Sequence, residues 1–122
     1  IEKGQIEGGF VQGAGWLTIE EVNWKSNGEL TTHSPSTYKI PAVNDMPEKF
    51  NAEIYKYGKN KENVVNKSKT TGEPPLMNAM SVFFAIKDAI ASISDYKITP
   101  IISGPATPEK ILMSIKNLEK KL

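Results

Sequence analysis

The chain has 122 residues, which suffices for one domain with a single hydrophobic core. Its 15 basic and 14 acidic residues leave a net charge of +1, so no broad attraction to nucleic acid or to an anionic membrane is expected. The absence of cysteine excludes a disulfide, a thiolate nucleophile and protein ligands for an iron–sulfur cluster. The single histidine, His33, has no partner at a ligand spacing, so no metal bound by side chains is expected.

Residues 5–21 predict a helix with two distinct sides. Helical spacing gathers one apolar side, made of Ile6, Phe10, Ala14 and Leu17. The other side is made of Gln5, Gly8, Gly9, Gln12, Gly13 and Trp16. Each glycine weakens a helix by up to about 1 kcal/mol relative to alanine, so another group is expected to approach this backbone closely. That group is a cofactor or a second helix, and from the residues alone a second helix is the commoner cause.

The middle of the chain predicts β structure. Asn27 and Gly28 lie between the short segments 22–24 and 29–32, which is a strong hairpin signal. Residues 50–55 alternate with period two, as a strand with one buried face does. The proline-rich segment 35–47 predicts an extended, ordered loop. With helices at both ends, the expected fold class is α+β, with a mixed sheet and helices packed on one side of it.

Two helices are predicted in the C-terminal third. Residues 76–93 form an apolar helical pattern with a narrow stripe of small and polar residues, and its charged and polar interruptions argue against a membrane-spanning helix. A last helix is expected to follow Thr107 as N-cap, with Pro108 at its first position.

Glu73 stands between Gly72 and two prolines, directly before the first of these helices. Pro74 disfavours a helical conformation at the preceding residue, and Pro75 can open a helix, so we expect Glu73 to be held at a strand-to-helix junction. A fixed carboxylate is suited to preorganised general-base catalysis. An acid at a helix start is also commonly a cap or a partner of the helix dipole, and the residues alone favour that interpretation.

Four segments, taken in order, carry a family resemblance: residues 4–8 (Gly-Gln-Ile-Glu-Gly), 35–41 (Pro-Ser-Thr-Tyr-Lys-Ile-Pro), 69–76 (Lys-Thr-Thr-Gly-Glu-Pro-Pro-Leu) and 105–110 (Pro-Ala-Thr-Pro-Glu-Lys). The chain resembles the C-terminal part of the molybdenum-binding subunit of the xanthine dehydrogenase and aldehyde oxidase family. Thr70 and Thr71 depart from the small and the aliphatic residue that this family has there. The departure concerns the shape of the pocket and leaves the carboxylate itself unchanged.

The resemblance implies a molybdenum hydroxylase. Glu73 matches the active-site base of the family, and Gln5 matches a glutamine that lies beside the cofactor. The implied cofactor is molybdenum-pyranopterin, with or without a nucleotide extension, in which the metal is bound through the pterin sulfurs. FAD and 2Fe-2S clusters are expected on other domains or subunits. The implied reaction hydroxylates an electron-poor carbon with water as the oxygen source.

The sequence starts at Ile1 rather than Met, so we expect a fragment or processed piece of a longer chain. The resemblance implies that residues 1–122 are a single C-terminal fragment of a molybdopterin-binding domain, inactive in isolation. The expected whole is a cytoplasmic, xanthine dehydrogenase-like oxidoreductase acting on a purine or another N-heterocycle. The alternatives are an aldehyde oxidoreductase of the same family and a non-catalytic structural or binding module. The expected partners are the remainder of the molybdenum-binding subunit, the iron–sulfur and flavin domains or subunits and a small-molecule substrate, and homo-oligomer formation is left open.

Overall fold

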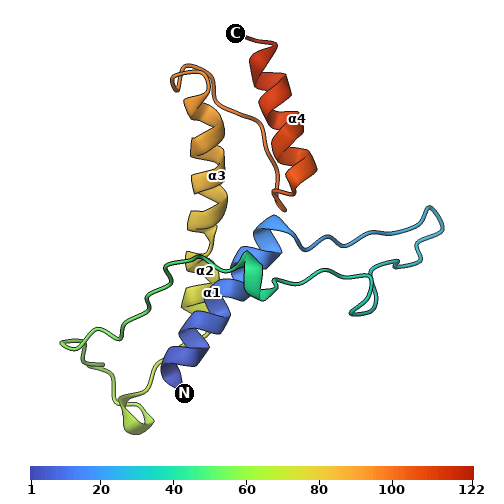
Figure 1. Ribbon diagram of the computed structural model, residues 1–122. Coiled ribbons are helices and arrows are strands. Elements are labelled where there is room, and N and C mark those ends of the chain that lie inside the picture. The colour runs from blue at the N-terminus through green and yellow to red at the C-terminus, as the bar shows by residue number, and fades with distance from the viewer.

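The computed structural model describes residues 1–122 and contains four α-helices. They are α1 (Glu2–Thr18), α2 (Glu73–Asn78), α3 (Met80–Ser92) and α4 (Pro108–Glu119), with single 3-10 turns at Val43–Asp45 and Val65–Lys67. Figure 1 shows α1 crossing α2, α3 continuing away from that crossing, and α4 beside α3. Two long irregular segments, between α1 and α2, extend to opposite sides of the helices.

The expected mixed sheet is absent, and the α+β fold class is wrong. The only β pairing is one antiparallel bridge, between Trp24 and Leu30. A strand is stable only when its N–H and C=O groups pair with a neighbouring strand, and an isolated two-stranded pair is marginal in water. Residues 50–55 do not form a strand, and their alternation finds no second strand to pair with. The chain is therefore helical with long irregular connections.

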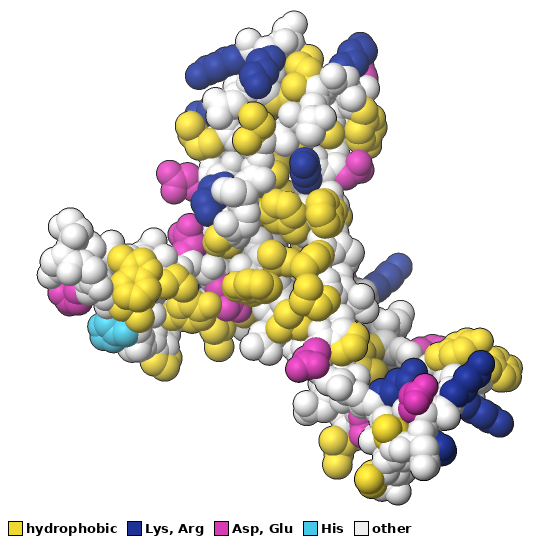
Figure 2. Space-filling view, turned by 180° about the vertical axis from the view of Figure 1, so that it is seen from behind, with side chains coloured by type: hydrophobic (Ala, Val, Ile, Leu, Met, Phe, Trp, Pro, Cys, Tyr) yellow, Lys and Arg dark blue, Asp and Glu magenta, His cyan; other side chains and the backbone are white.

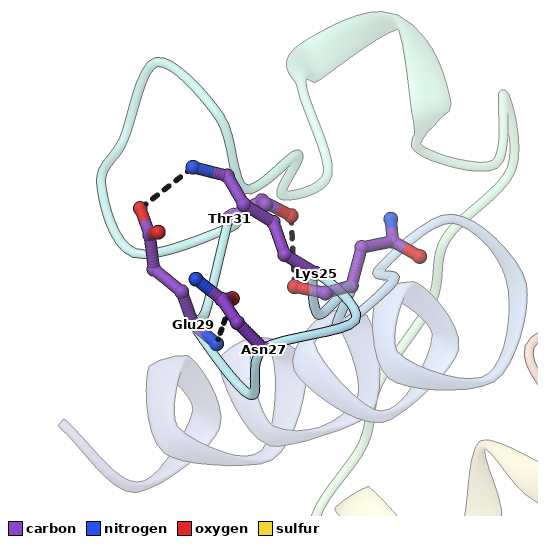
Figure 3. A network of polar contacts seen from close by, with 5 residues as sticks. Lys25, Asn27, Glu29 and Thr31 are labelled. Atoms are coloured by element: carbon purple, nitrogen blue, oxygen red, sulfur yellow. Dashed lines mark hydrogen bonds and ion pairs between the residues drawn. The ribbon is translucent and has the colours of Figure 1, made fainter.

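The turn at Asn27–Gly28 lies where the sequence predicts it, although its arms pair only at that bridge. Gly28 adopts a φ of 84°, a left-handed value that favours glycine. Figure 3 shows the polar network of this turn: Lys25 pairs with Glu29 at 2.8 Å, and the Glu29 N–H donates to Asn27 Oδ1 at 3.1 Å. These local contacts explain how a short segment keeps a defined turn without a sheet.

The predicted helix over 76–93 is present but starts earlier and is divided in two. Its first part, α2, begins at Glu73, and the division falls at Ala79, which is fully buried against α1. The Ala79 N–H is shared between the carbonyl oxygens of Pro75 and Leu76, each at 3.2 Å. Such shared bonds are common where a helical turn tightens at an end. A single apolar periodicity therefore covers two short helices.

The last helix confirms its predicted start. Thr107 is the N-cap of α4, its Oγ1 accepts from the Lys110 N–H at 3.4 Å, and Pro108 occupies the first position. The Ala106 N–H donates to the Leu17 carbonyl at 2.7 Å, which ties the start of α4 to the end of α1. Leu118 is buried on the inner side of α4. Local capping and one long-range backbone bond together locate this helix.

The buried core is small for the length of the chain. Only 10 of the 122 residues are buried, and the accessible surface is 9503 Å². A compact monomer of 13.5 kDa is expected to expose roughly 6,500 Å². Large apolar side chains such as Trp16, Trp24 and Phe84 are more than half exposed. Figure 2 shows hydrophobic side chains gathered over the middle of one face, and none of the helices is long and apolar enough to cross a membrane.

Candidate functional site

A polar groove lies between the first three turns of α1 and the start of α2. Its volume is about 700 Å³. A single apolar side chain contributes to its lining. The lining residues are Gly4, Gln5, Gly8, Gly9, Gln12, Lys69, Thr70, Thr71, Gly72, Glu73 and Leu76. The groove therefore brings together Gln5 and Glu73, the two residues singled out in the sequence.

Gln5 is held on the open side of α1. It lies in the second turn of that helix, where its N–H donates to the Ile1 carbonyl at 3.1 Å. Its side chain is exposed and makes no hydrogen bond within the chain. An unpaired amide offers two donors and one acceptor to a bound molecule.

Glu73 is the first residue of α2, with Gly72 as the N-cap in a helical conformation. The predicted strand-to-helix junction is therefore wrong, because Glu73 itself is helical. The two prolines that follow lie in the first turn, where backbone N–H groups have no partner within the helix, so they rigidify the turn without losing a hydrogen bond. The backbone of Glu73 is held by a helical turn instead of an extended segment.

The Glu73 carboxylate is exposed and has no partner in the chain. All four ion pairs of the structure lie elsewhere, and no side-chain hydrogen bond reaches Glu73. The helix-cap interpretation would require this carboxylate to accept an N–H from its own helix, as Thr107 does in α4. Glu73 makes no such bond. Its carboxylate is available to a molecule in the groove.

Four of the five glycines of α1 divide into two sets. A Cβ at Gly9 or Gly13 would lie within 2.5 Å of a carbonyl oxygen of the 72–76 segment, so these two glycines permit close packing of two helices. A Cβ at Gly4 or Gly8 would meet nothing within 4 Å, although both positions line the groove. The glycine-rich side of α1 therefore packs against a second helix, as the residues alone favoured. At Gly4 and Gly8 the same side leaves the α1 backbone accessible from the groove.

The groove has further polar residues to which the sequence assigned no catalytic or cofactor-binding role, although Thr70 and Thr71 were expected to affect the shape of the pocket. Gln12 lies seven residues after Gln5, which places both amides on one side of α1. Thr70 and Thr71 add hydroxyl groups, and Lys69 is the only basic residue among the lining residues. The spacing of the two glutamines was the available signal. Lys69, Thr70 and Thr71 line the groove only because the loop before α2 folds back to α1, which no local pattern in the sequence specifies.

The proline-rich segment 35–41 does not line the groove, and hydroxyl groups of this segment make hydrogen bonds within the chain. The Tyr38 hydroxyl donates to Glu20 Oε2 at 2.5 Å, and this hydrogen bond to a carboxylate raises the pKa of Tyr38. The Thr37 hydroxyl bonds the Ser34 carbonyl at 3.2 Å, as a backbone-directed hydroxyl. His33 is exposed, and no cluster of acidic, histidine or cysteine side chains could hold a metal ion.

The chain is similar to known proteins along almost its whole length. Residues 1–47, which include Gln5, match the model of the molybdopterin cofactor-binding domain. The chain is 47% identical to a xanthine dehydrogenase/oxidase of Felis catus over 117 residues, which cover 91% of this chain and 9% of the relative. It is 44% identical to xanthine dehydrogenase 1 of Arabidopsis thaliana over 124 residues, covering 93% of the chain and 9% of the relative. It is 42% identical to the xanthine dehydrogenase of Oryza sativa over 133 residues, which cover 99% of this chain and 10% of the relative.

With a cofactor-domain match at one side of the groove and this identity along almost the whole chain, the chain belongs to the xanthine dehydrogenase and aldehyde oxidase family of molybdenum hydroxylases. It spans about a tenth of the length of the curated relatives that it matches.

Proposed function

We propose that this chain forms one wall of a molybdenum hydroxylase active site, with Glu73 as the base and Gln5 as a cofactor contact. The observation that carries the proposal is the groove itself. Gln5 and Glu73 are remote in sequence and come from different helices, yet both line one groove and neither has an internal partner. A purely structural role for both residues would not require their side chains to face a common open space.

The groove fits a molybdenum-pyranopterin cofactor. Its volume of about 700 Å³ is within the range of about 300–1,000 Å³ that is common for small-molecule sites. Amide, hydroxyl and ammonium groups line it, which suits the ring nitrogens and oxygens of a pterin. Gly4 and Gly8 leave space that a Cβ would fill, so a flat ring could approach the α1 backbone. In this family the metal is held by pterin sulfurs, so the groove has no need of a cluster of metal-ligating side chains.

The protein's contribution to the reaction is to bind, to orient and to move a proton. When bound, the cofactor supplies the redox centre at which an electron-poor carbon is hydroxylated. Glu73 accepts a proton at a carboxylate oxygen as oxygen is transferred to the substrate. Gln5 donates from Nε2 and accepts at Oε1, which orients the cofactor relative to that carboxylate. The proline-containing first turn of α2 keeps the backbone that carries the base at a defined position beside the groove.

A purine or another N-heterocycle is the proposed substrate, because the relatives carry the name xanthine dehydrogenase. The proposed partners are the remainder of the cofactor-binding protein and the domains or subunits that hold FAD and iron–sulfur clusters. Support for such partners comes from the accessible surface of 9503 Å², which exceeds the roughly 6,500 Å² of a compact monomer of this size.

The test of this proposal is the molybdenum and pterin content of the protein that carries this segment. We expect both to copurify with the wild-type protein. Gln5→Ala removes the amide without leaving a buried cavity, since Gln5 is exposed, so cofactor content or turnover should fall while the melting temperature is unchanged.

Asn117→Ala is the matched control, because Asn117 is an exposed amide on α4 outside the groove. It should leave both quantities unchanged. Wild-type protein without molybdenum or pterin would favour the structural-module alternative. Full cofactor content and turnover in Gln5→Ala would remove Gln5 from the site.

A further inference from the structure

One contact between α1 and the residue before Glu73 leaves no room for a side chain. A Cβ built on Gly9 would lie 2.5 Å from the Gly72 carbonyl oxygen and 3.4 Å from Pro75 Cβ. Real Cβ atoms essentially never come closer than 3.0 Å to another heavy atom. The obstacle is backbone and cannot rotate away as a flexible side chain would. Any residue larger than glycine at position 9 must therefore move the Gly72 peptide or move α1.

The peptide that would move is the one that holds Glu73. Gly72 is bonded directly to Glu73, and its carbonyl accepts the Leu76 N–H at 3.4 Å, closing the first turn of α2. Gly9 lies four residues after Gln5, so the contact and the Gln5 side chain are on the same side of α1. The distance across the groove between the Glu73 carboxylate and the Gln5 amide thus depends on how closely Gly72 approaches Gly9.

We propose that Gly9 is a positioning residue for the base: its missing side chain seats the Gly72–Glu73 peptide against α1 and so fixes the Glu73 carboxylate beside the cofactor groove. This inference rests on the proposed function of Glu73. The distance from a Cβ at position 9 to the Gly72 carbonyl oxygen, 2.5 Å, is about 0.9 Å less than the 3.4 Å at which ordinary van der Waals contact begins. A displacement of about 1 Å at a catalytic group can lower the rate about 10²-fold.

The experiment is Gly9→Ala in the molybdenum-loaded protein that carries this segment. We expect kcat to fall about 10²-fold while KM changes far less and the molybdenum and pterin content stays at the wild-type value. Gly15→Ala is the matched control. It is the same substitution on the same helix, and its Cβ would lie 2.3 Å from Pro41 Cγ, so it creates a steric clash with a side chain that does not involve α2. Gly15→Ala is expected to lower the melting temperature and to leave kcat unchanged.

A double-mutant cycle with Glu73→Gln separates positioning from a general structural effect. If Gly9 acts through Glu73, Gly9→Ala should cause no further loss of kcat in the Glu73→Gln background. An equal loss in both backgrounds would overturn the inference, and so would a loss of molybdenum in proportion to activity. Normal kcat in Gly9→Ala together with a large loss in Glu73→Gln would overturn this inference alone. Normal kcat in Glu73→Gln would overturn the proposed function itself.

A second variant keeps the test decisive if Gly9→Ala does not fold. Glu73→Asp withdraws the carboxylate by one methylene and creates no backbone clash, because this side chain is exposed. The inference requires the position of the carboxylate to matter, so kcat should again fall at constant molybdenum content. Wild-type turnover in Glu73→Asp would overturn the positioning role.

Discussion

Replacing Glu73 by glutamine is expected to lower kcat by about 10²–10⁴-fold in the molybdenum-loaded protein that carries this segment. Glutamine has nearly the same volume and still makes hydrogen bonds, but it cannot accept the proton that the proposed base must remove. Stability should change by at most about 0.3–1 kcal/mol, which is typical for one charge at a helix start. Steady-state kinetics and thermal unfolding of the same preparation measure the two effects.

Glu109→Gln is the control for the charge effect. Glu109 is the acidic residue in the first turn of α4, so it has the same relation to a helix dipole and lies outside the groove. It should show the small stability change without a change in kcat. If Glu73→Gln behaves like Glu109→Gln, with turnover preserved, Glu73 is a dipole partner of α2 and its catalytic role is lost.

The second large effect concerns the packing of α1 against α2. A Cβ at the buried Gly13 would lie 2.4 Å from the Leu76 carbonyl oxygen and 2.8 Å from the Cβ of the fully buried Ala79. Overpacking of this kind typically costs about 1–3 kcal/mol, so Gly13→Ala should lower the free energy of unfolding despite the better helix propensity of alanine. Chemical denaturation of the variant chain measures this change.

Gly8→Ala, on the same helix, is expected to change the free energy of unfolding in the opposite direction. A Cβ at position 8 meets nothing within 4 Å, so only the helix propensity changes. Its free energy of unfolding should rise by about 0.5–1 kcal/mol. Two glycine-to-alanine variants five residues apart are therefore expected to change the free energy of unfolding in opposite directions. Equal shifts in one direction would show that α1 does not pack on α2 as described.

Capping and turn features were predictable from the sequence because they depend on neighbouring residues. Thr107 and Pro108 specify the start of α4 through one local hydrogen bond and one fixed φ angle. Asn27 and Gly28 specify a turn that forms even without a sheet. The segment that contains Glu73 and the one that contains Gln5 were identified by their resemblance to a family, and the comparisons confirm that family.

The sequence did not predict how these pieces would pair. The alternation at residues 50–55 indicated a strand, but a strand needs a partner, and whether one lies beside it is a property of the whole fold. The break at Ala79 was likewise hidden, because one apolar periodicity is compatible with one long helix or with two short ones.

By itself the sequence determined the helices at both ends and the cap of α4, and it singled out the amide of Gln5 and the carboxylate of Glu73. Only the tertiary structure decided that Gly9 and Gly13 pack against α2, that Gly4 and Gly8 stay open, and that Gln5 and Glu73 line one groove. The physical reason is the range of the interactions. Caps and turns form between residues a few positions apart, whereas the approach of α1 to α2 depends on close contact between backbones remote in sequence, which no local pattern specifies.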